Sequence, residues 1–500
     1  MKQKIYLFLL LVWIGSFLPE SQLLETYAAT DTMQEKISLI EEEIQKNMNI
    51  HDIPGMAFAL VDKNGTIFAN GFGILDVRDD SSKIDEYTNF QLGSLSKVFT
   101  SLAIMQLQEK GDINIEKPVV EYLPWFSIKD SFLSNQITIK HLLNHSSGLP
   151  GRLNVHDVDT IDRQEIIRAV KQKLNGVILV GKPGEVYEYT NMNTDLLQLV
   201  IEEVTGESFE NYMNEQIFKP LEMNRTGYFT YQDRQLNNTA TGHRYHWGDL
   251  RPYKEELVYA TSNSAGLSSN VRDLANFMIM LLNDGKQDTK SLASANSIAE
   301  MFQPNDWGIG YNWYIYPHNV YMEGGLPSFT STMVLAADQS FGFVLLSNSK
   351  QNITLHTGFN LFKILNEQTP TTLAVSDFPK IDYDAKIILT IVIMIGIVLV
   401  WTVTLLVYQL IKGSKRIAFS RPGGKKSIFL LLILSLFLGI MTYIYVILPY
   451  YIGVPTLYDF KKEPDFIMGI LLFTIIYSVY SLCLCFRILF VRNVINDHVV

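Results

Sequence analysis

The stretch Gln91–Thr100 contains a serine and a lysine at a spacing that suits nucleophilic catalysis. Ser94 and Lys97 open a run with apolar residues at helical spacing, and Gly111 ends that run. One helical turn brings the lysine amine within hydrogen-bonding reach of the serine hydroxyl. Burial would keep the amine neutral, as a general base requires, and the N–H groups of a helix N-terminus can stabilise an oxyanion. Because this spacing is common by chance, the pair alone is weak evidence.

A second stretch places polar side chains in a tight loop. Tyr189 and Asn191 follow the Gly181–Gly184 turn and precede a helical pattern, and loops of this kind direct side chains into clefts. A phenol close to a lysine ammonium would have its phenolate favoured and would be able to carry the Ser94 proton. Asn191 can donate to a substrate carbonyl. The alternative is a packing role, since Tyr189 is one of 25 tyrosines.

A third stretch, Glu323-Gly324-Gly325-Leu326, precedes a strand-like run. Paired glycines there let another backbone approach the strand edge. Such an edge can bind a peptide-like substrate by strand addition and can supply an oxyanion N–H. A plain hairpin turn is the alternative interpretation.

In order and spacing, these three stretches resemble the active-site motifs of the class C β-lactamase and penicillin-binding serine hydrolase family. The resemblance covers about residues 33–365 and includes Ile137–Pro150 and Gly71–Gly73. It implies a two-lobed α/β (α+β) serine β-lactamase-like fold, an antiparallel sheet flanked by helices plus a helical lobe, with the site between the lobes. It also implies an acyl-enzyme mechanism with these roles: Ser94 as nucleophile, Lys97 and Tyr189 moving protons, the N–H groups of Ser94 and Leu326 holding the oxyanion, Asn191 contacting substrate, and His145 as a structural residue.

Glu323 departs from the family pattern, in which Lys or His usually opens the third motif. A cation at this position would meet the carboxylate of a β-lactam or of a D-Ala-D-Ala stem, whereas an acid would repel it. We therefore expect a substrate that is neutral or carries an amine near the scissile bond.

These features predict a membrane-anchored serine peptidase or amidase that acts on a small peptide or an N-acyl-D-amino acid substrate. The layout is similar to that of the colibactin-maturation-type prodrug peptidases, although this parallel rests partly on architecture. A cell-wall D-alanyl esterase or penicillin-binding protein is one alternative. Another is a sensor in which acylation is signalled through the membrane, but the cytoplasmic loop leaves no room for an output domain.

The elements that position these residues follow from periodicity. Strand-like runs at both ends of the domain should pair into one antiparallel sheet, and the middle should form a helical lobe. Asn64-Gly65 predicts a hairpin. The expected strands are 55–62, 66–73, 308–316, 320–322, 330–336 and 341–347. The expected helices are 31–48, 94–108, 137–145, 163–173, 193–205, 209–218, 271–283 and 355–365.

The ends of the chain predict export and membrane insertion. Residues 1–29 read as a signal peptide, 30–366 as the hydrolase domain, 367–385 as a linker and 386–500 as a transmembrane region. An uncleaved membrane anchor is the alternative interpretation of this segment, because Thr26-Tyr27-Ala28 matches a cleavage site only roughly. The three expected spans are Ile387–Ile411, Ile428–Leu448 and Phe466–Phe486. A basic loop after the first span predicts a multi-pass protein of the cell membrane with its catalytic domain extracytoplasmic.

Charge and cysteine content limit the partners. The whole chain has a formal net charge of −10, and residues 386–500 are basic, so the exported domain is strongly acidic. An acidic surface argues against nucleic acid, which leaves a small peptide or acyl-ester substrate and membrane lipid as expected partners. Cys483 and Cys485 both lie in the third expected span. No His-Glu-x-x-His motif is present, so no metal and no cofactor are expected. Nothing in the sequence indicates the oligomeric state.

Overall fold

The structure is a computed structural model. It describes residues 33–151, 153, 155, 160, 162–228, 238–246, 249–253, 262–287, 289–349, 353–371, 377–412, 415–417, 472–480 and 491–493.

A seven-stranded antiparallel sheet joins the two ends of the predicted domain 30–366, as the strand patterns predicted. Its strand order is β11-β12-β13-β14-β1-β2-β3, so the first strand pairs with the last, Met56 opposite Ser347. The strands are β1 (Gly55–Asp62), β2 (Gly65–Asp76), β3 (Asp79–Lys83), β11 (Tyr314–Ile315), β12 (Asn319–Gly325), β13 (Thr330–Ala336) and β14 (Gly342–Ser347). The expected strand 308–316 is mostly turn, because Gly308 and Asn312 have positive φ angles.

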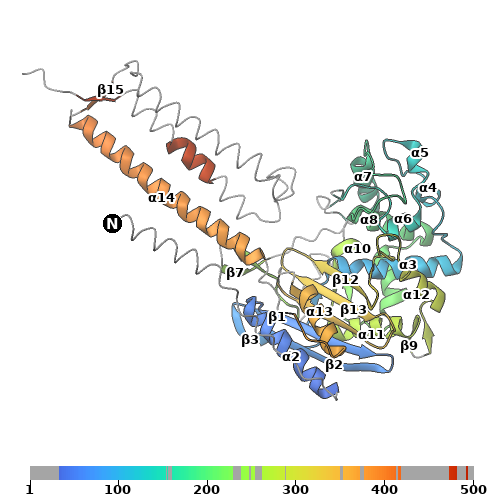
Figure 1. Cartoon of the computed structure of the whole chain (residues 1–500). Helices are drawn as coiled ribbons and strands as arrows, with labels where there is room; N and C mark the ends of the chain where they lie inside the picture. Colours follow the sequence, from blue (N-terminus) through green and yellow to red (C-terminus); the bar gives the residue numbers. More distant parts are fainter. Residues whose placement is uncertain are drawn as a thin grey trace, which may run out of the picture.

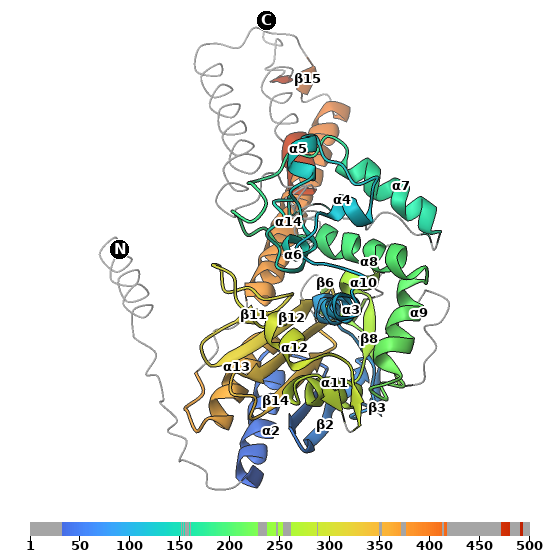
Figure 2. The same ribbon diagram turned by 90° about the vertical axis from the view of Figure 1, so that its right-hand side faces the viewer.

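Both faces of the sheet are covered. In β1, Met56, Phe58 and Leu60 pack on one side, and the alternate residues pack on the other. On the first side lie α2 (Met33–Ile50) and α13 (Ile353–Leu365), which contact each other; on the second lies α11 (Val271–Leu282). Figures 1 and 2 show α2 and α13 together on one side of the sheet.

The helical lobe is inserted between β3 and β11. Its longer helices are α3 (Lys97–Lys110), α7 (Arg163–Leu174) and α8 (Asn191–Thr205). The shorter ones are α4 (Val119–Tyr122), α5 (Ser131–Ser134), α6 (Ile139–Leu143), α9 (Phe209–Met213), the π-helical turn η2 (Asn214–Phe218), α10 (Ser262–Ala265) and α12 (Ala295–Met301). In both ribbon views α3 lies at the boundary between this lobe and the sheet.

Short strands form the remaining sheets. The three-stranded sheet contains β4 (Phe90–Gln91), β8 (Leu267–Ser269) and β5 (Gly227–Tyr228). The two-stranded sheets pair β6 (His243–His246) with β7 (Asp249–Pro252), β9 (Lys286–Gln287) with β10 (Lys290–Ser291), and β15 (Lys415–Ile417) with β16 (Val491–Asn493).

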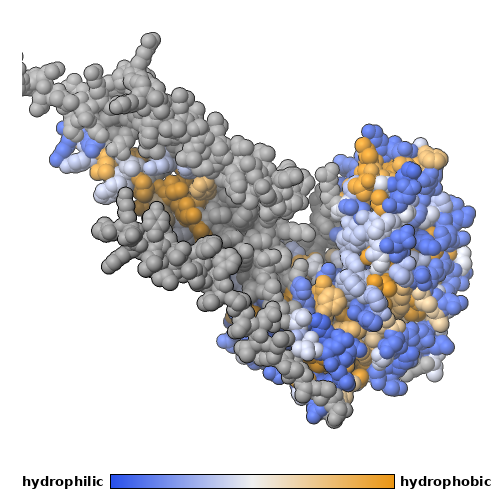
Figure 3. Space-filling view, in the orientation of Figure 1, coloured by the Kyte–Doolittle hydropathy of each residue, from blue (hydrophilic) through white to orange (hydrophobic). Residues whose placement is uncertain are grey.

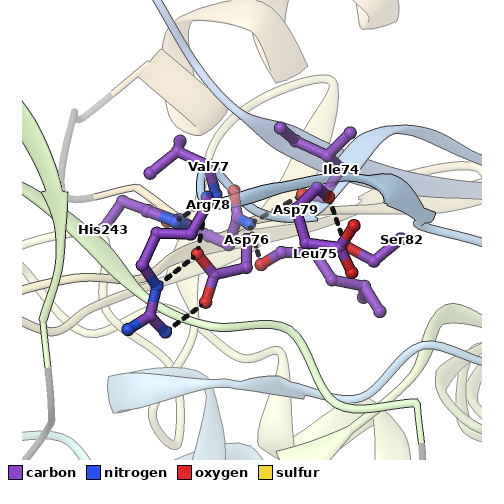
Figure 4. Close-up of polar contacts among 9 residues, drawn as sticks. Ile74, Leu75, Asp76, Val77, Arg78, Asp79, Ser82 and His243 are labelled. Atoms are coloured by element: carbon purple, nitrogen blue, oxygen red, sulfur yellow. Dashed lines mark hydrogen bonds and ion pairs between the residues drawn. The ribbon is translucent and has the colours of Figure 1, made fainter.

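His243 fastens the turn between β2 and β3 to the rest of the sheet. Its Nε2 accepts a hydrogen bond from the Val77 N–H at 3.1 Å, and its Nδ1 lies 3.2 Å from the Asn348 carbonyl at the end of β14. In the same turn, the Arg78 guanidinium binds the Asp76 carboxylate (Figure 4). These contacts link β2, β6 and β14.

A long helix, α14 (Asp377–Ile411), follows the domain (Figure 1). It begins inside the predicted linker 367–385, where Pro379 falls in the first helical turn, a position that proline tolerates. Within the described residues one helical segment, Leu389–Gln409, has the length and hydropathy to cross a membrane. Its side chains are largely exposed, for example Ile397, Val400 and Trp401, and apolar surface follows this helix in Figure 3.

The other predicted spans fall largely on residues that the structure does not describe. Ile428–Leu448 lies wholly outside the described residues, as do the signal segment 1–29 and both cysteines. Of Phe466–Phe486, residues 472–480 are described, and they are helical. The three-span arrangement therefore stays a prediction.

Candidate active site

The serine of the first motif stands on a sharp turn between a strand and a helix. After β4, residues Gly93–Ser96 form the 3₁₀ turn η1, which continues directly into α3. Gly93 has φ +57°, and a Cβ there would lie 2.8 Å from the Gly325 nitrogen, so only glycine allows this approach to β12. The expected helix 94–108 thus begins as a 3₁₀ turn and presents Ser94 at the sheet.

Two side chains contact the Ser94 hydroxyl. The Lys97 Nζ lies 3.1 Å from Ser94 Oγ, and the Tyr189 hydroxyl donates to the same oxygen at 2.7 Å. The structure therefore brings together the first and second predicted motifs, which are separated by 95 residues in the sequence. A serine oxygen that accepts from the tyrosine still has its own proton to give to the lysine.

Lys97 is buried completely and is held by a backbone carbonyl. Its Nζ donates to the Ser264 carbonyl at 2.6 Å, on the short helix α10. Burial lowers the pKa of Lys97 to about 7, although the nearby Asp195 carboxylate acts in the opposite direction. The amine is therefore available as a base near neutral pH, as the sequence predicted.

Tyr189 differs from the prediction that its phenolate would be favoured. Burial raises the pKa of Tyr189 well above its usual range, and the charge of Glu323 acts in the same direction. With a pKa of about 7, Lys97 is only partly charged near neutral pH, so it supplies less positive charge than a full ammonium would. Tyr189 is therefore a protonated donor to Ser94 in this site.

His145 supports the Tyr189 ring. The two rings stack with their centroids 4.4 Å apart and an interplanar angle of 30°. The Asn193 amide and the Asn312 carbonyl oxygen each lie 3.0 Å from one ring nitrogen of His145. Burial lowers the pKa of His145 to about 3, so the imidazole is neutral, which agrees with the structural role expected for it.

The third motif forms one wall of the site. Ser94, Tyr189 and Glu323 line a cavity of about 210 Å³. Its other lining residues are Tyr314, Met322, Gly324, Gly325, Thr330 and Thr354. None of these residues carries a positive charge. Burial raises the pKa of the Glu323 carboxyl, which sits partly buried on β12.

One of the two predicted oxyanion donors is already hydrogen-bonded within the protein. The Leu326 N–H donates to the Phe329 carbonyl at 2.9 Å inside the β12–β13 turn. This hydrogen bond uses the N–H that the resemblance assigns to the oxyanion, so in this conformation that donor is occupied. The Ser94 N–H lies in the first turn of η1, where N–H groups lack a partner within the helix.

Asn191 is the first residue of α8 rather than a loop residue, because Thr190 caps the helix.

Three groups around the site were not predicted from the sequence. Tyr314 lies on the short strand β11, and Ser264 acts through its main chain, so neither gives a motif. Asp195 is buried on α8 beside Lys97. The sequence did offer a signal for Asp195: an acid that stands one turn beyond Asn191 and directly before two leucines of the helical pattern. No group of His, Cys, Asp or Glu side chains suited to a metal ion occurs in the described part of the chain.

Comparison with known families gives a match over most of the domain. The family model described as Beta-lactamase matches residues 40–358. The protein named Protein flp from Staphylococcus aureus (strain N315) is 31% identical over 328 residues, which cover 65% of this chain and 64% of that protein. The chain therefore spans just under two thirds of the length of this relative.

Two further relatives agree with that match. The protein named "Putative penicillin-binding protein PbpX" from Bacillus subtilis (strain 168) is 29% identical, with 67% of this chain and 81% of that protein covered. Among solved structures, the octameric penicillin-binding protein homologue from Pyrococcus abyssi has a TM-score of 0.59 at 25% identity. That alignment covers 70% of this chain and 81% of the other.

Proposed function

This chain belongs to the beta-lactamase family, and from that premise we propose that it is a serine hydrolase that forms a covalent acyl-enzyme on Ser94. The observation that carries the proposal is the convergence of Lys97 Nζ and the Tyr189 hydroxyl on Ser94 Oγ. A nucleophile, a buried base and a proton donor are the groups that acyl transfer needs.

The chemistry follows from the protonation states. Lys97, as the free amine, takes the Ser94 proton while Oγ attacks the substrate carbonyl carbon. The tetrahedral intermediate collapses when the bond to the leaving group breaks, and the leaving group takes a proton from the Tyr189 hydroxyl, which Lys97 then replaces. Water attacks the acyl-enzyme with Lys97 again as the base, which releases the acid and restores Ser94.

A fluorophosphonate probe tests this proposal on the full chain in detergent. We expect a mass increase of one adduct in the wild type and none in Ser94→Ala. The matched control is Ser340→Ala, which replaces an exposed serine on the turn between β13 and β14. This variant should be labelled like the wild type. Labelling of Ser94→Ala, or none in the wild type, would refute an activated Ser94. A stable adduct with true substrates, without product release, would favour the sensor instead.

For the substrate, we propose a small peptide or an N-acyl-D-amino acid amide, cleaved by peptidase or amidase chemistry. The small cavity and the absence of a cation among its lining residues support a substrate without a carboxylate beside the scissile bond. The same feature argues against a β-lactam or a D-Ala-D-Ala stem, which carries that carboxylate.

A D-alanyl esterase is a second candidate, and Glu323 favours it. An ionised carboxylate in a partly dry cavity attracts the ammonium of a D-alanyl ester, and a charged hydrogen bond of this kind contributes about 1.5–3 kcal/mol. In this case the acyl group that Ser94 receives carries the positive charge.

Two matched substrates separate the candidates: a D-alanyl ester and the same ester with its amine acetylated. An esterase should prefer the free amine, and Glu323→Gln should lower kcat/KM for that substrate by about tenfold or more, since 1.4 kcal/mol corresponds to tenfold. An N-acyl peptidase should prefer the acetylated substrate. If Glu323→Lys raised activity on the amine-bearing ester, recognition of an ammonium by this carboxylate would be disproved.

We further propose that the enzyme is a multi-pass protein of the cell membrane whose catalytic domain is extracytoplasmic. The apolar helix Leu389–Gln409 and the basic residues that follow it in the sequence support an anchor of this orientation. The multi-pass part of the proposal depends on the further apolar stretches 428–448 and 466–486 of the sequence. Anchoring would keep the enzyme beside membrane lipid and close to a cell-wall or exported substrate.

A further inference from the structure

The two most exposed large apolar side chains of the described hydrolase domain belong to one end of the helical lobe. Phe132, on α5, has 71% of its surface exposed, and Ile178, in the loop after α7, has 66%. No other large apolar side chain in the described part of that domain exceeds 53%. The Lys129 N–H donates to the Val177 carbonyl at 3.1 Å, which ties the segment before α5 to this loop. Apolar side chains that gather on a surface in this way mark a contact site, whereas singly scattered ones do not.

A hollow of about 650 Å³ is lined by both segments. Its apolar lining includes Leu133, Ile178 and Leu179, and two lysines, Lys129 and Lys182, line it as well. In Figures 1 and 2, α5 and α7 lie at the end of the lobe farthest from the sheet, and Figure 3 shows apolar surface at that end. This end of the lobe therefore combines exposed apolar side chains with ammonium groups.

This end of the lobe is basic, although the domain as a whole is strongly acidic. Residues 125–135 and 168–186, which we call the lobe tip, contain five Lys or Arg and two Asp or Glu, a net charge of +3. Of the two acids, Asp130 is used as the cap of α5, and Glu185 lies 3.6 Å from Lys182 Nζ. A negatively charged surface would attract the lobe tip and repel the rest of the domain, so it would bind the domain in one orientation.

The apolar helix of the same chain would bring such a surface within reach. The helix α14 begins at Asp377, and its apolar segment begins at Leu389. The helical residues between these two positions span about 18 Å at 1.5 Å per residue, so an inserted α14 keeps the domain beside the bilayer. With that tether, docking on the bilayer is an intramolecular step, for which a small surface of weak affinity is sufficient. A domain without the tether would not stay bound through so small a surface.

We propose that the lobe tip is a membrane-docking surface, whose side chains Phe132, Ile178 and Val180 enter the headgroup region of a bilayer that contains anionic lipid. This inference rests on the proposed anchoring of α14 in the membrane and is independent of the chemistry at Ser94. Exposed aromatic and aliphatic side chains flanked by lysines are typical of interfacial membrane contacts. Each lysine near an anionic bilayer strengthens the contact by about fivefold. Docking therefore fixes the orientation of the hydrolase domain on the bilayer.

Brominated lipid acyl chains quench tryptophan fluorescence, which tests this contact on the full chain in nanodiscs. Phe132→Trp places a reporter on the lobe tip, and Ile50→Trp, which replaces an exposed apolar residue at the end of α2, is the matched control. The nanodiscs contain equal parts of brominated phosphatidylcholine and phosphatidylglycerol. After subtraction of the wild-type signal, the tryptophan at position 132 should lose about half or more of its fluorescence, because an interfacial side chain lies close to the acyl chains. The tryptophan at position 50 should keep its fluorescence.

The role of the lysines is tested by charge reversal. Lys129→Glu combined with Lys182→Glu, in the Phe132→Trp background, should remove most of the quenching, as should replacement of phosphatidylglycerol by phosphatidylcholine. Lys83→Glu combined with Lys286→Glu reverses two exposed lysines outside the lobe tip and should leave the quenching unchanged. Quenching that persists after reversal at the lobe tip and in the neutral lipid would overturn the recognition of anionic headgroups.

Two other outcomes would overturn the docking surface itself. One is an unquenched tryptophan at position 132 that acrylamide in the water still reaches. The other is a tryptophan protected from acrylamide but not quenched by bromine, because a second protein copy rather than lipid would then cover the lobe tip. Anchoring is read separately from Trp401, which is exposed on the apolar helix and should be quenched in the wild type. If Trp401→Phe leaves the wild-type quenching unchanged, the proposed anchoring fails, and this inference fails with it.

Discussion

At the scale of single residues, Tyr189 and Lys97 have separable roles at Ser94. Because the Tyr189 hydroxyl is a protonated donor, Tyr189→Phe should mainly slow departure of the leaving group. We expect kcat to fall by about 10²–10⁴ for an amide and by less for an aryl ester, whose leaving group needs no proton. Steady-state kinetics on the two substrates measures this difference. Equal losses on both would show that the hydroxyl acts on Ser94 before bond cleavage.

The pKa of the Lys97 amine predicts how the reaction rate depends on pH. Only the neutral amine accepts the serine proton, and its pKa is about 7. The rate of Ser94 labelling should therefore rise with pH through about 7 and fall about tenfold per pH unit below it, until a second group titrates. Stopped-time labelling between pH 5 and 9 measures this limb. A rate independent of pH across this range would exclude Lys97 as the base.

At the scale of elements, the backbones of β12 and η1 approach each other closely. A Cβ at Gly324 would lie 1.9 Å from the Leu92 carbonyl oxygen, whereas one at Gly325 would meet nothing within 4 Å. Gly324→Ala should therefore push β12 from η1 and lower the melting temperature, by about 4 °C or less per kcal/mol for a domain of this size. Gly325→Ala is the matched control for stability. Equal melting temperatures would show that the two elements separate freely.

Because His243 joins these strands through a neutral ring, the domain should lose stability in acid. Burial lowers the pKa of His243 from 6.5, and the neutral ring accepts the Val77 N–H. Above pH 6.5 the stabilisation is complete. As the pH falls below that value, the unfolded chain binds the proton first, and stability is lost at up to about 1.4 kcal/mol per pH unit.

Denaturant unfolding between pH 4 and 7 measures this loss, which should be smaller in His243→Gln. His51, His141 and His145 also have lowered pKa values, so a partial loss should remain in that variant. The exposed His246 of the same strand supplies the control His246→Gln. An unchanged pH dependence in His243→Gln would mean that this ring does not carry the effect.

At the scale of the whole molecule, the packing contacts of the hydrolase domain end before the apolar helix begins. Asn360 on α13 bonds to both the N–H and the carbonyl of Thr371, and α14 starts at Asp377. A chain that ends at residue 371 should therefore keep Ser94 labelling and move from the membrane to the soluble fraction. Fractionation followed by probe labelling measures both. Retention in the membrane would place an anchor in the N-terminal segment.

Much of this arrangement was predictable because the signals are local. The Asn64-Gly65 turn and the strand runs follow from neighbouring residues, and the spacing of Ser94 and Lys97 follows from helical geometry. The Thr190 cap, which starts α8 at Asn191, was not predicted. The Tyr189 proton was not predictable, since its pKa depends on how deeply the fold buries the phenol. The Leu326 hydrogen bond and the Ser264 carbonyl are main-chain contacts that no side-chain type encodes.

The pairing of β1 with β14 has a consequence for how the chain folds. The central pair of the sheet joins segments separated by nearly the whole domain, so its contact order is high and its folding is correspondingly slow. At a synthesis rate of about 5–20 residues per second, β1 waits many seconds for its partner. During that interval the nascent chain has no complete sheet, so proteases and chaperones can reach it. For the same reason the chain is still unfolded enough to pass through a narrow pore. The nucleophile turn contacts β12, which is part of the same late-forming sheet.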